Sequence, residues 1–412
     1  MKIKFYDELN TIKVCEKDLN GRDIHYTSID DCVLVGYDTF YPNTLIKSDN
    51  HDFLILPIKE TFMSLKSGTV YEKTMEFDYN EQNRSYVVIE DPVFFFICNN
   101  TNYYHFLYDS LPYLTTYFKL KKTNPNMKLL MNYPDSSKNN FFPFVLETLS
   151  ILGIPMSDVI IHNENHKYNT VYIGSSLTHN KTPNLPPREE VYGLFNRMTE
   201  SVELNTITPK RIYISRRTWT HNDLSNIGTN YTTRRKLMNE DLLVNSLLSL
   251  GFTEVFCEKM SMEEKIHLFK NAEVVVGPIG GGMCNVLFSK PTTKVLSIIS
   301  PKFMDINERF IFSMCKTTVK NIDVSYFYED RLLKTGMRVL LGDDRVGEIS
   351  TFLGDGKYGI SLRKIGTTGC ESTNESKNIV CDENELSPID DGLNSPWLVD
   401  LGELMIHINK LI

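Results

Sequence analysis

Apolar runs of strand length alternate with stretches of helical spacing along the chain, and this alternation restricts the fold more than any other feature. The second half contains four such runs, at residues 211–215, 254–257, 273–276 and 294–299. Helical stretches at residues 239–250 and 262–271 separate the first three, and a glycine-rich turn precedes the fourth. Short strands that alternate with helices are typical of a largely parallel sheet with both faces covered. The sequence therefore predicts an α/β fold.

The first half of the chain has the same texture. Helical stretches at residues 103–120 and 142–152 lie among strand-like runs at residues 32–35, 53–56, 86–89, 93–98, 128–131, 158–161 and 170–173. The opening segment, to about residue 91, is the richest in strand-like runs. Because a domain usually holds about 100–200 residues, a chain of 412 residues is expected to contain two such units and a smaller part.

Changes in composition mark the predicted domain boundaries. Residues 179–188 are rich in proline and asparagine, as connectors often are, and beyond residue 334 glycines punctuate short alternating runs. That pattern predicts a small antiparallel β-barrel. We therefore predict an N-terminal α/β domain at 1–190, a Rossmann-like domain at 191–333, a β-rich insertion with a polar loop at 334–392, and a C-terminal helix at 393–412 that packs back on the core.

Composition excludes several classes of protein. With 41% hydrophobic and 23% charged residues the chain is typical of a folded globular protein, and a net charge of −8 argues against a protein that coats nucleic acid. The sequence has no apolar stretch of the ~18 residues that a membrane helix needs, and its first residues lack a signal peptide, so we expect a cytoplasmic protein without an integral membrane segment. The eight cysteines are scattered, which predicts reduced thiols and no zinc site.

A histidine and a carboxylate form the first candidate site. His105 and Asp109 stand four residues apart in a predicted helix, so they share one helix face. Such a pair can remove a proton from a hydroxyl group. The same spacing also fits a histidine that hydrogen-bonds its own aspartate for stability alone.

A basic run and a glycine-rich turn form the other two candidates. Guanidinium groups just after a strand suit a diphosphate, although a solvated loop would have the same composition; the run holds Arg211, Arg216, Arg217, Arg234, Arg235 and Lys236. Four glycines between residues 277 and 282 follow a valine strand and precede a helix, where backbone amides can approach an anion. The turn could equally serve close packing alone.

In their order and spacing these segments resemble glycosyltransferase family 61. The matching pieces are N-x-x-H-F-x-x-D-x-L-P, Ser-Arg after a strand, R-x-x-x-N-E, S-x-x-E and G-P-x-G-G-G-x-x-N-x-x-F, at residues 102–112, 215–216, 235–240, 261–264 and 277–288. The resemblance covers about residues 93–301. It implies a GT-B architecture, in which two Rossmann-like domains face a cleft, an inverting reaction, and no metal or other cofactor.

The resemblance also implies roles for individual residues. The N-terminal domain would hold a glycan or glycoprotein acceptor, through Asn102 and Tyr104, and either His105 or Asp109 would be the base. The second domain would bind a UDP-sugar donor, with xylose or N-acetylglucosamine most expected, through Arg216, Arg235, Asn239, Glu240, Gly277, Gly280, Gly281, Gly282 and Asn285. No nucleic-acid partner is expected.

Three positions depart from the family pattern. Ile279 stands where histidine is usual, Lys265 stands where glutamine is customary, and Ser297 stands where the strand often carries glutamate. An inactive relative that binds a nucleotide sugar or a carbohydrate is therefore an alternative. A second alternative is that the β-rich insertion binds a nucleic acid or a protein, but its few aromatic residues disfavour base stacking.

Overall fold

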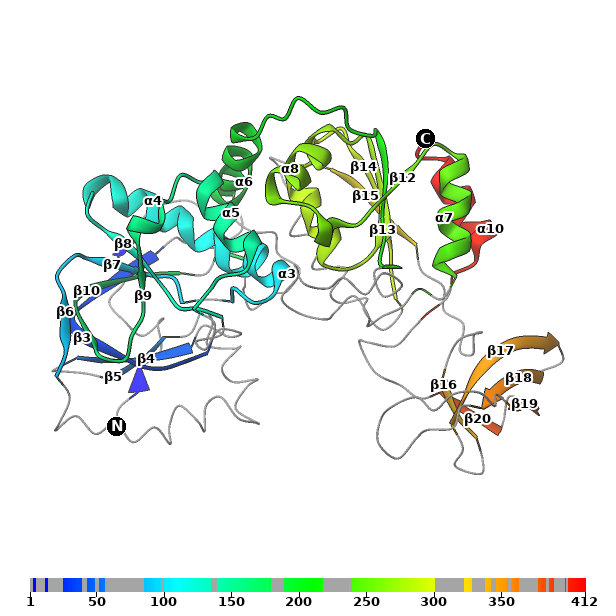
Figure 1. Cartoon of the computed structure of the whole chain (residues 1–412), viewed down its shortest axis with the longest axis horizontal. Coiled ribbons are helices and arrows are strands. Elements are labelled where there is room, and N and C mark those ends of the chain that lie inside the picture. The colour runs from blue at the N-terminus through cyan, green and yellow to red at the C-terminus, as the bar shows by residue number, and fades with distance from the viewer. Residues whose placement is uncertain are drawn as a thin grey trace.

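The computed structural model describes two α/β regions and a separate antiparallel sheet. The described residues are 85–97, 99–134, 139–175, 177–178, 189–217, 237, 239–300, 322–327, 397 and 399–412, with the strand segments 3–4, 12–13, 25–38, 43–48, 52–55, 338–341, 346–354, 357–362, 377–382 and 385–388. These residues form two sheets with their helices and a third, separate sheet (Figure 1).

The second α/β region contains a fully parallel sheet of five strands. Its order is β12 (Thr253–Val255), β11 (Arg211–Ile214), β13 (Val274–Pro278), β14 (Lys294–Ile298) and β15 (Asp323–Phe327). The chain therefore moves outward in opposite directions from β11, first to β12 and then to β13. In open α/β sheets, ligands bind at such a switch point, outside the carboxyl ends of the strands.

Alternating side chains of this sheet pack against helices on both faces. Tyr213 of β11 shares a buried cluster with helices α7 (Glu240–Ser249) and α10 (Leu401–Asn409), which lie side by side in Figure 1. Ile212 and Ile214 point to the other face, toward α8 (Met262–Asn271) and the 3₁₀-helix η9 (Gly281–Phe288). Because both faces of the sheet are covered, successive side chains of each strand are buried, which explains the continuous apolar runs in the sequence.

The first α/β region contains a mixed sheet, and the expectation of a largely parallel one was wrong for its outer half. Strands β10 (His166–Gly174), β7 (Val93–Phe95), β8 (Lys128–Met131) and β9 (Val159–Ile161) are parallel to their neighbours, as is the short β6 (Val87–Ile89) to β10. However, β3 (His25–Asp38) is antiparallel to β10 and begins an antiparallel group with β4 (Asn43–Ser48), β5 (Asp52–Ile55) and β2 (Ile12–Lys13). The four residues between β3 and β4 are too few for a parallel crossover.

The helical stretch after residue 102 is not one continuous α-helix. It consists of α3 (Tyr103–His105), a π-helical turn η3 (Phe106–Ser110), a 3₁₀ turn η4 (Leu111–Tyr113) and α4 (Leu114–Thr123). Pro112 provides no amide hydrogen for an α-helical ladder, and the Leu111 amide bonds the Phe106 carbonyl instead. Wide turns of this kind are frequent at functional sites.

One buried cluster joins the two α/β regions. It combines Leu107 of η3, side chains of α5 (Pro143–Ile151) and α6 (Glu189–Ser201), and side chains of α8 and η9. A backbone contact supports this packing, since the Met262 amide at the start of α8 donates to Glu147 Oε2 of α5 at 2.7 Å. The two regions are therefore packed directly on each other.

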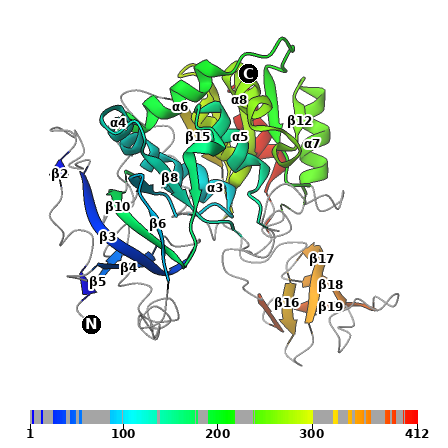
Figure 2. The ribbon, with the colours of Figure 1, turned by 60° about the vertical axis from the view of Figure 1, so that its left-hand side comes forward.

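The C-terminal sheet stands apart from both regions (Figures 1 and 2). It is antiparallel, in the order β19 (Lys377–Asp382), β18 (Lys357–Leu362), β17 (Val346–Gly354), β16 (Arg338–Leu341) and β20 (Leu386–Pro388), and has its own small buried cluster. The predicted antiparallel strands are present. Closure into a barrel and the predicted domain boundaries stay predictions.

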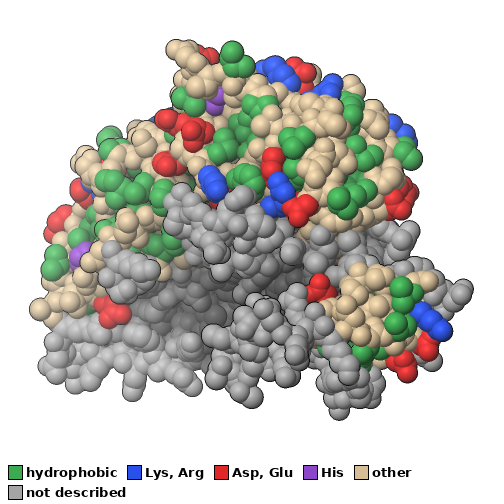
Figure 3. Space-filling view, turned by 45° about the vertical axis from the view of Figure 1, so that its right-hand side comes forward, with side chains coloured by type: hydrophobic (Ala, Val, Ile, Leu, Met, Phe, Trp, Pro, Cys, Tyr) green, Lys and Arg blue, Asp and Glu red, His purple; other side chains and the backbone are tan. Residues whose placement is uncertain are grey.

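The surface of the described residues carries charges of both signs. Figure 3 shows acidic and basic side chains interspersed among apolar ones on the face that it presents. None of the helices that the structure describes has the length and apolar character needed to cross a membrane.

Candidate functional site at the switch point

Arg216 lies at the switch point of the parallel sheet, immediately beyond β11. Its side chain is buried, with 7% of the residue exposed, and its Nη1 donates to the Ile279 carbonyl at 3.4 Å. Gly280 faces the same guanidinium so closely that a side chain at this position would collide with Nη1. The glycine-rich turn and the predicted diphosphate-binding arginine are therefore direct neighbours.

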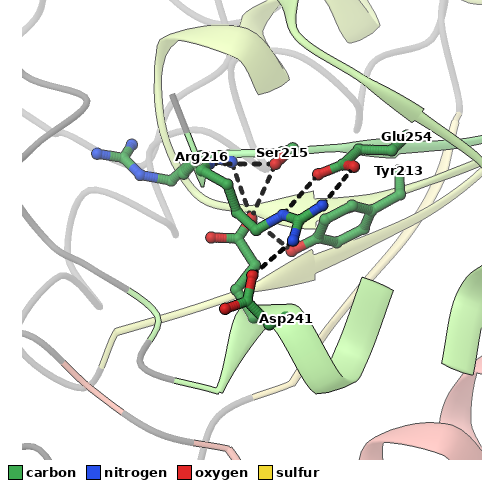
Figure 4. A network of polar contacts seen from close by, with 7 residues as sticks. Tyr213, Ser215, Arg216, Asp241 and Glu254 are labelled. Carbon is green, nitrogen blue, oxygen red and sulfur yellow. Dashed lines mark hydrogen bonds and ion pairs between the residues drawn. The ribbon is translucent and has the colours of Figure 1, made fainter. Parts of the chain in front are cut away.

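A single buried carboxylate fixes the backbone from which Arg216 projects. Glu240 Oε1 accepts hydrogen bonds from the Tyr213 hydroxyl at 2.9 Å, the Ser215 hydroxyl at 3.3 Å and the Arg216 amide at 2.8 Å (Figure 4). Burial raises the pKa of Glu240 to about 7, although these donors partly oppose the effect. Glu240 thus contacts the Arg216 backbone directly.

Arg217 has a different environment from its neighbour. Its Nε and Nη2 donate to the two carboxylate oxygens of Glu254 at 2.8 and 2.6 Å, and its Nη1 donates to Asp241 at 2.5 Å. In Figure 4 the Arg216 side chain points away from this network. Two carboxylates therefore engage Arg217 within the protein. Arg235, Arg234 and Lys236 lie outside the described residues, and the role of Arg235 stays a prediction.

The predicted His–Asp pair is in contact. His105 Nδ1 lies 2.5 Å from Asp109 Oδ2, with 35% of the histidine side chain and 14% of the aspartate side chain exposed. Asn102 begins this helical segment, because its side chain accepts a hydrogen bond from the His105 amide at 3.2 Å. Tyr104 packs edge-on against the His105 ring, with 5.2 Å between the ring centroids.

Contacts between the two α/β regions bring this pair to the glycine-rich segment. The Tyr103 hydroxyl, two residues before His105, donates to Asn285 Oδ1 at 2.5 Å, and Asn285 Nδ2 donates to the Gly282 carbonyl at 2.9 Å. Burial raises the pKa of the Cys284 thiol, and the charge of Asp109 raises it further. The α3 segment that carries His105 and the Arg216 side chain therefore both contact residues 279–285, through Tyr103 and through the Ile279 carbonyl.

The other predicted donor residues have mainly structural contacts. Asn239 Nδ2 donates to the Val399 carbonyl at 2.7 Å, which ties the start of α7 to the segment before α10. At both Gly277 and Gly282 an added Cβ would lie within 3 Å of Ile214, so close packing requires these glycines. Gly281 has open space around its Cα. Direct contacts of these residues with a donor stay predictions.

The three departures from the family pattern are all buried. Ile279, Lys265 and Ser297 are 2%, 6% and 0% exposed, respectively. Lys265 Nζ lies 4.5 Å from the centre of the Tyr103 ring, and burial lowers the pKa of Lys265. Glu264, in contrast, completes a capping box with Ser261 at the start of α8, which gives that part of the motif a structural role.

Sequence reasoning missed Tyr103, Glu147 and Tyr213 as parts of the site. Tyr103 lies inside the quoted motif, where its position before His105 was the only available signal. Glu147 contacts the Met262 amide, and Tyr213 contacts Glu240. Both partners lie far away in the sequence, so the spacing of residues within a motif does not reveal these contacts. Within the described ranges, no group of three or more His, Cys, Asp or Glu residues could hold a metal ion; metal independence stays a prediction.

The sequence model of one family matches residues 103–296, and its description is Glycosyltransferase 61. This region belongs to glycosyltransferase family 61. The match confirms the resemblance to this family that the motifs indicated. The matched residues include both the His–Asp pair and the glycine-rich turn. A comparison with curated proteins finds no significant match. The match of this region to family 61 suggests glycosyltransferase activity, which requires a sugar donor and an acceptor.

Proposed function

We propose that the protein is an inverting, metal-independent glycosyltransferase that moves a sugar from a UDP-sugar to a hydroxyl group of a glycan or glycoprotein. Xylose and N-acetylglucosamine are the expected sugars. The observation that carries the proposal is that Arg216 and the helical segment with the His105–Asp109 pair both contact residues 279–285, the segment through Tyr103. A positive group for the leaving diphosphate and a base for the acceptor are the two requirements of a single displacement.

The donor half of the proposal rests on the switch point. Arg216 projects beside the turn at Gly280, which precedes η9, and the start of a helix favours negative charge. In the transition state the guanidinium would stabilise the charge that develops on the diphosphate. Arg235 is predicted to bind the same diphosphate, and its guanidinium would add a second planar set of hydrogen-bond donors.

The acceptor half rests on the two ring nitrogens of His105. With Nδ1 bound to Asp109, Nε2 is the nitrogen that would take the proton from the acceptor hydroxyl. The oxygen would then attack the anomeric carbon from the face opposite the diphosphate, and the bond to the diphosphate would break. Asp109 would hold the ring in one tautomer and stabilise the imidazolium. The greater exposure of His105 favours it over Asp109 as the base.

The GT-B arrangement is part of the same proposal. Each of the two α/β regions contains parallel strands, and the proposed base and Arg216 come from different regions, which supports this arrangement. The β-rich segment at 334–392 would then be an insertion before the last helix, α10.

An inactive relative is the second candidate, and the buried Ile279 favours it. An apolar side chain there provides no proton donor for the donor sugar or the diphosphate where the family usually has histidine. A protein of this kind would bind the nucleotide sugar without turnover.

One set of measurements distinguishes the two candidates. Purified protein is tested with UDP-xylose, UDP-N-acetylglucosamine and other nucleotide sugars by thermal shift, because a ligand that binds only the folded state raises the melting temperature. UDP release then separates transfer or hydrolysis from binding alone. A thermal shift with UDP release supports the enzyme, a shift without release over a broad acceptor panel supports the inactive relative, and neither signal with any donor contradicts both.

Metal independence has its own test. The sequence lacks a D-x-D motif on a strand-end loop, so UDP release is expected to persist in excess EDTA. Loss of release in EDTA and its recovery with Mn²⁺ or Mg²⁺ would contradict this part of the proposal.

A further inference from the structure

Lys265 is a buried cation close to the proposed donor site. It lies in the second turn of α8, with only 6% of the residue exposed, and its Nζ is placed over the Tyr103 ring. In the described part of the chain this ring face is its only direct polar contact, and no carboxylate forms an ion pair with it. A ring face satisfies one side of an ammonium group that has three N–H donors.

Three carboxylates, Glu147, Glu258 and Glu264, act electrostatically on Lys265, but within the described residues none of them forms an ion pair with its ammonium group. Glu147 accepts a hydrogen bond from the Met262 amide, and Glu264 accepts one from the Ser261 amide, both at the start of α8. Glu258 acts electrostatically on Lys265, but it acts on Arg216 as well. Lys265 is therefore close to carboxylates but hydrogen-bonded to none of them among the described residues, so its ammonium group keeps N–H donors for a further partner.

Lys265 also lies at the edge of the sheet where the carboxyl ends of the parallel strands meet. Cys257, which acts on Lys265 electrostatically, comes directly after the carboxyl end of β12, and Tyr103 bonds Asn285 of η9. Arg216 and Gly280 follow the carboxyl ends of β11 and β13. Because carboxyl ends of parallel strands meet at one edge, Lys265 and Arg216 belong to the same end of the sheet.

We propose that Lys265 is a second cationic residue of the donor site, whose ammonium group binds an anionic oxygen of the nucleotide sugar. This inference rests on the proposed donor site and adds a residue that the family pattern does not provide, because glutamine is customary at this position. The anionic oxygen can belong to the diphosphate or to a carboxylate on the sugar. A buried charge without an ion pair costs stability, and a bound anion would offset that cost.

Lys265→Met tests the proposal, because methionine keeps the length and apolar stem of the side chain but removes its charge. Lys259→Met is a matched control, since Lys259 also lies over a ring, that of Phe256 at 5.4 Å, but is exposed. Calorimetry with inorganic pyrophosphate, UDP and UDP-glucuronate is performed on both variants, on the wild type and on Arg216→Ala. Thermal melting without ligand is recorded for each protein.

We expect Lys265→Met to melt at a higher temperature than the wild type without ligand, and to bind at least one of these probes about tenfold more weakly or worse. Weaker binding of pyrophosphate and UDP assigns Lys265 to the diphosphate, whereas weaker binding of UDP-glucuronate alone assigns it to a sugar carboxylate. Unchanged affinities in Lys265→Met alongside weakened ones in Arg216→Ala would overturn the role of Lys265 and leave the donor site in place. Failure of the wild type to bind any probe would overturn both.

Discussion

Arg216 and Arg217 are adjacent in sequence but differ in their surroundings. Two carboxylates engage the Arg217 guanidinium, whereas Arg216 is directed to the glycine-rich turn. Sequence alone assigns both to one basic run, because two adjacent arginines after a strand have the same charge and the sequence does not show which partners their side chains meet. The structure therefore separates a proposed ligand-binding arginine from a structural one.

Replacing each of these arginines tests that separation. Arg216→Ala is expected to weaken UDP binding by about 1.5–3 kcal/mol, because a charge-assisted contact is lost, and Arg216→Lys is expected to rescue it poorly. Arg217→Ala changes the net charge equally but is expected to leave UDP affinity near that of the wild type and to lower the free energy of unfolding by about 1–2 kcal/mol. Equal loss of UDP affinity in both alanine variants, measured by calorimetry, would contradict the distinction.

The buried Glu240 predicts a specific dependence of stability on pH. Its pKa is raised from 4.5 to about 7 in the folded protein, so between these values the folded state binds more protons than the unfolded state. The stabilisation that its protonated form provides is complete below about pH 4.5 and is lost as pH rises through about 7. Glu240→Gln keeps an acceptor oxygen but does not titrate. The unfolding free energy of this variant relative to the wild type is expected to rise by about 3 kcal/mol between pH 4.5 and 8.

Urea unfolding of both proteins at several pH values measures this difference. Parallel stability profiles for Glu240→Gln and the wild type would mean that Glu240 is ionised in the folded protein at neutral pH.

Removing His105 and removing Asp109 are expected to lower kcat by different factors. His105→Ala is expected to lower kcat by about 10²–10⁴-fold, because the base is lost, and Asp109→Asn is expected to lower it less. Circular dichroism and UDP titration establish that both variants are folded and bind the donor. A deeper loss of kcat in Asp109→Asn would give the base role to the carboxylate, and unchanged kcat in both would remove this helical segment from the mechanism.

At the scale of elements, the glycine-rich turn between β13 and η9 combines packing with the proposed function. Gly277 and Gly282 face Ile214, Gly280 faces Arg216, and Gly281 faces open space. Two adjacent glycines with such different neighbours provide a matched pair of substitutions.

Gly280→Ala is expected to displace the Arg216 guanidinium and so to weaken UDP binding about as much as Arg216→Ala does. Its effect on folding is expected to be small, because the group that must move is the end of a flexible side chain. Gly281→Ala adds the same methyl group one residue further on, where nothing lies within 4 Å in the described structure, and is expected to bind UDP normally. Similar UDP affinities in the two variants would contradict the assignment of Gly280.

The elements themselves were predictable where local pattern and tertiary packing agree. β8 (Lys128–Met131) and α8 (Met262–Asn271) have the predicted bounds, because a bounded apolar run and a capping box define them locally. The π-helical turn at Phe106–Ser110 was not predicted, because a single wide turn of five residues is too short to change the apolar periodicity of the surrounding helical stretch. Before β6, the runs expected at residues 32–35 and 53–56 overlap β3 and β5, whereas β2 and β4 were not expected. The pairing of β3 depends on β10, which lies far along the chain.

At the scale of the whole molecule, one buried cluster joins the helices of both α/β regions. Sequence predicted two regions and the order of the motifs, but it did not show that α5 contacts α8 or that Tyr103 bonds Asn285. Those contacts place the proposed base beside the proposed donor site. The proposed transfer reaction therefore requires that the two regions act as one catalytic unit.

The most direct test follows the anomeric proton by NMR during reaction of purified protein with UDP-xylose and UDP-N-acetylglucosamine, in parallel with His105→Ala. We predict that the wild type consumes a UDP-sugar and that the first product has the inverted anomeric configuration. We expect the rate to be at least about a hundredfold lower in His105→Ala. A retained configuration, or no consumption of any nucleotide sugar by wild-type protein that binds UDP, would contradict the proposed mechanism.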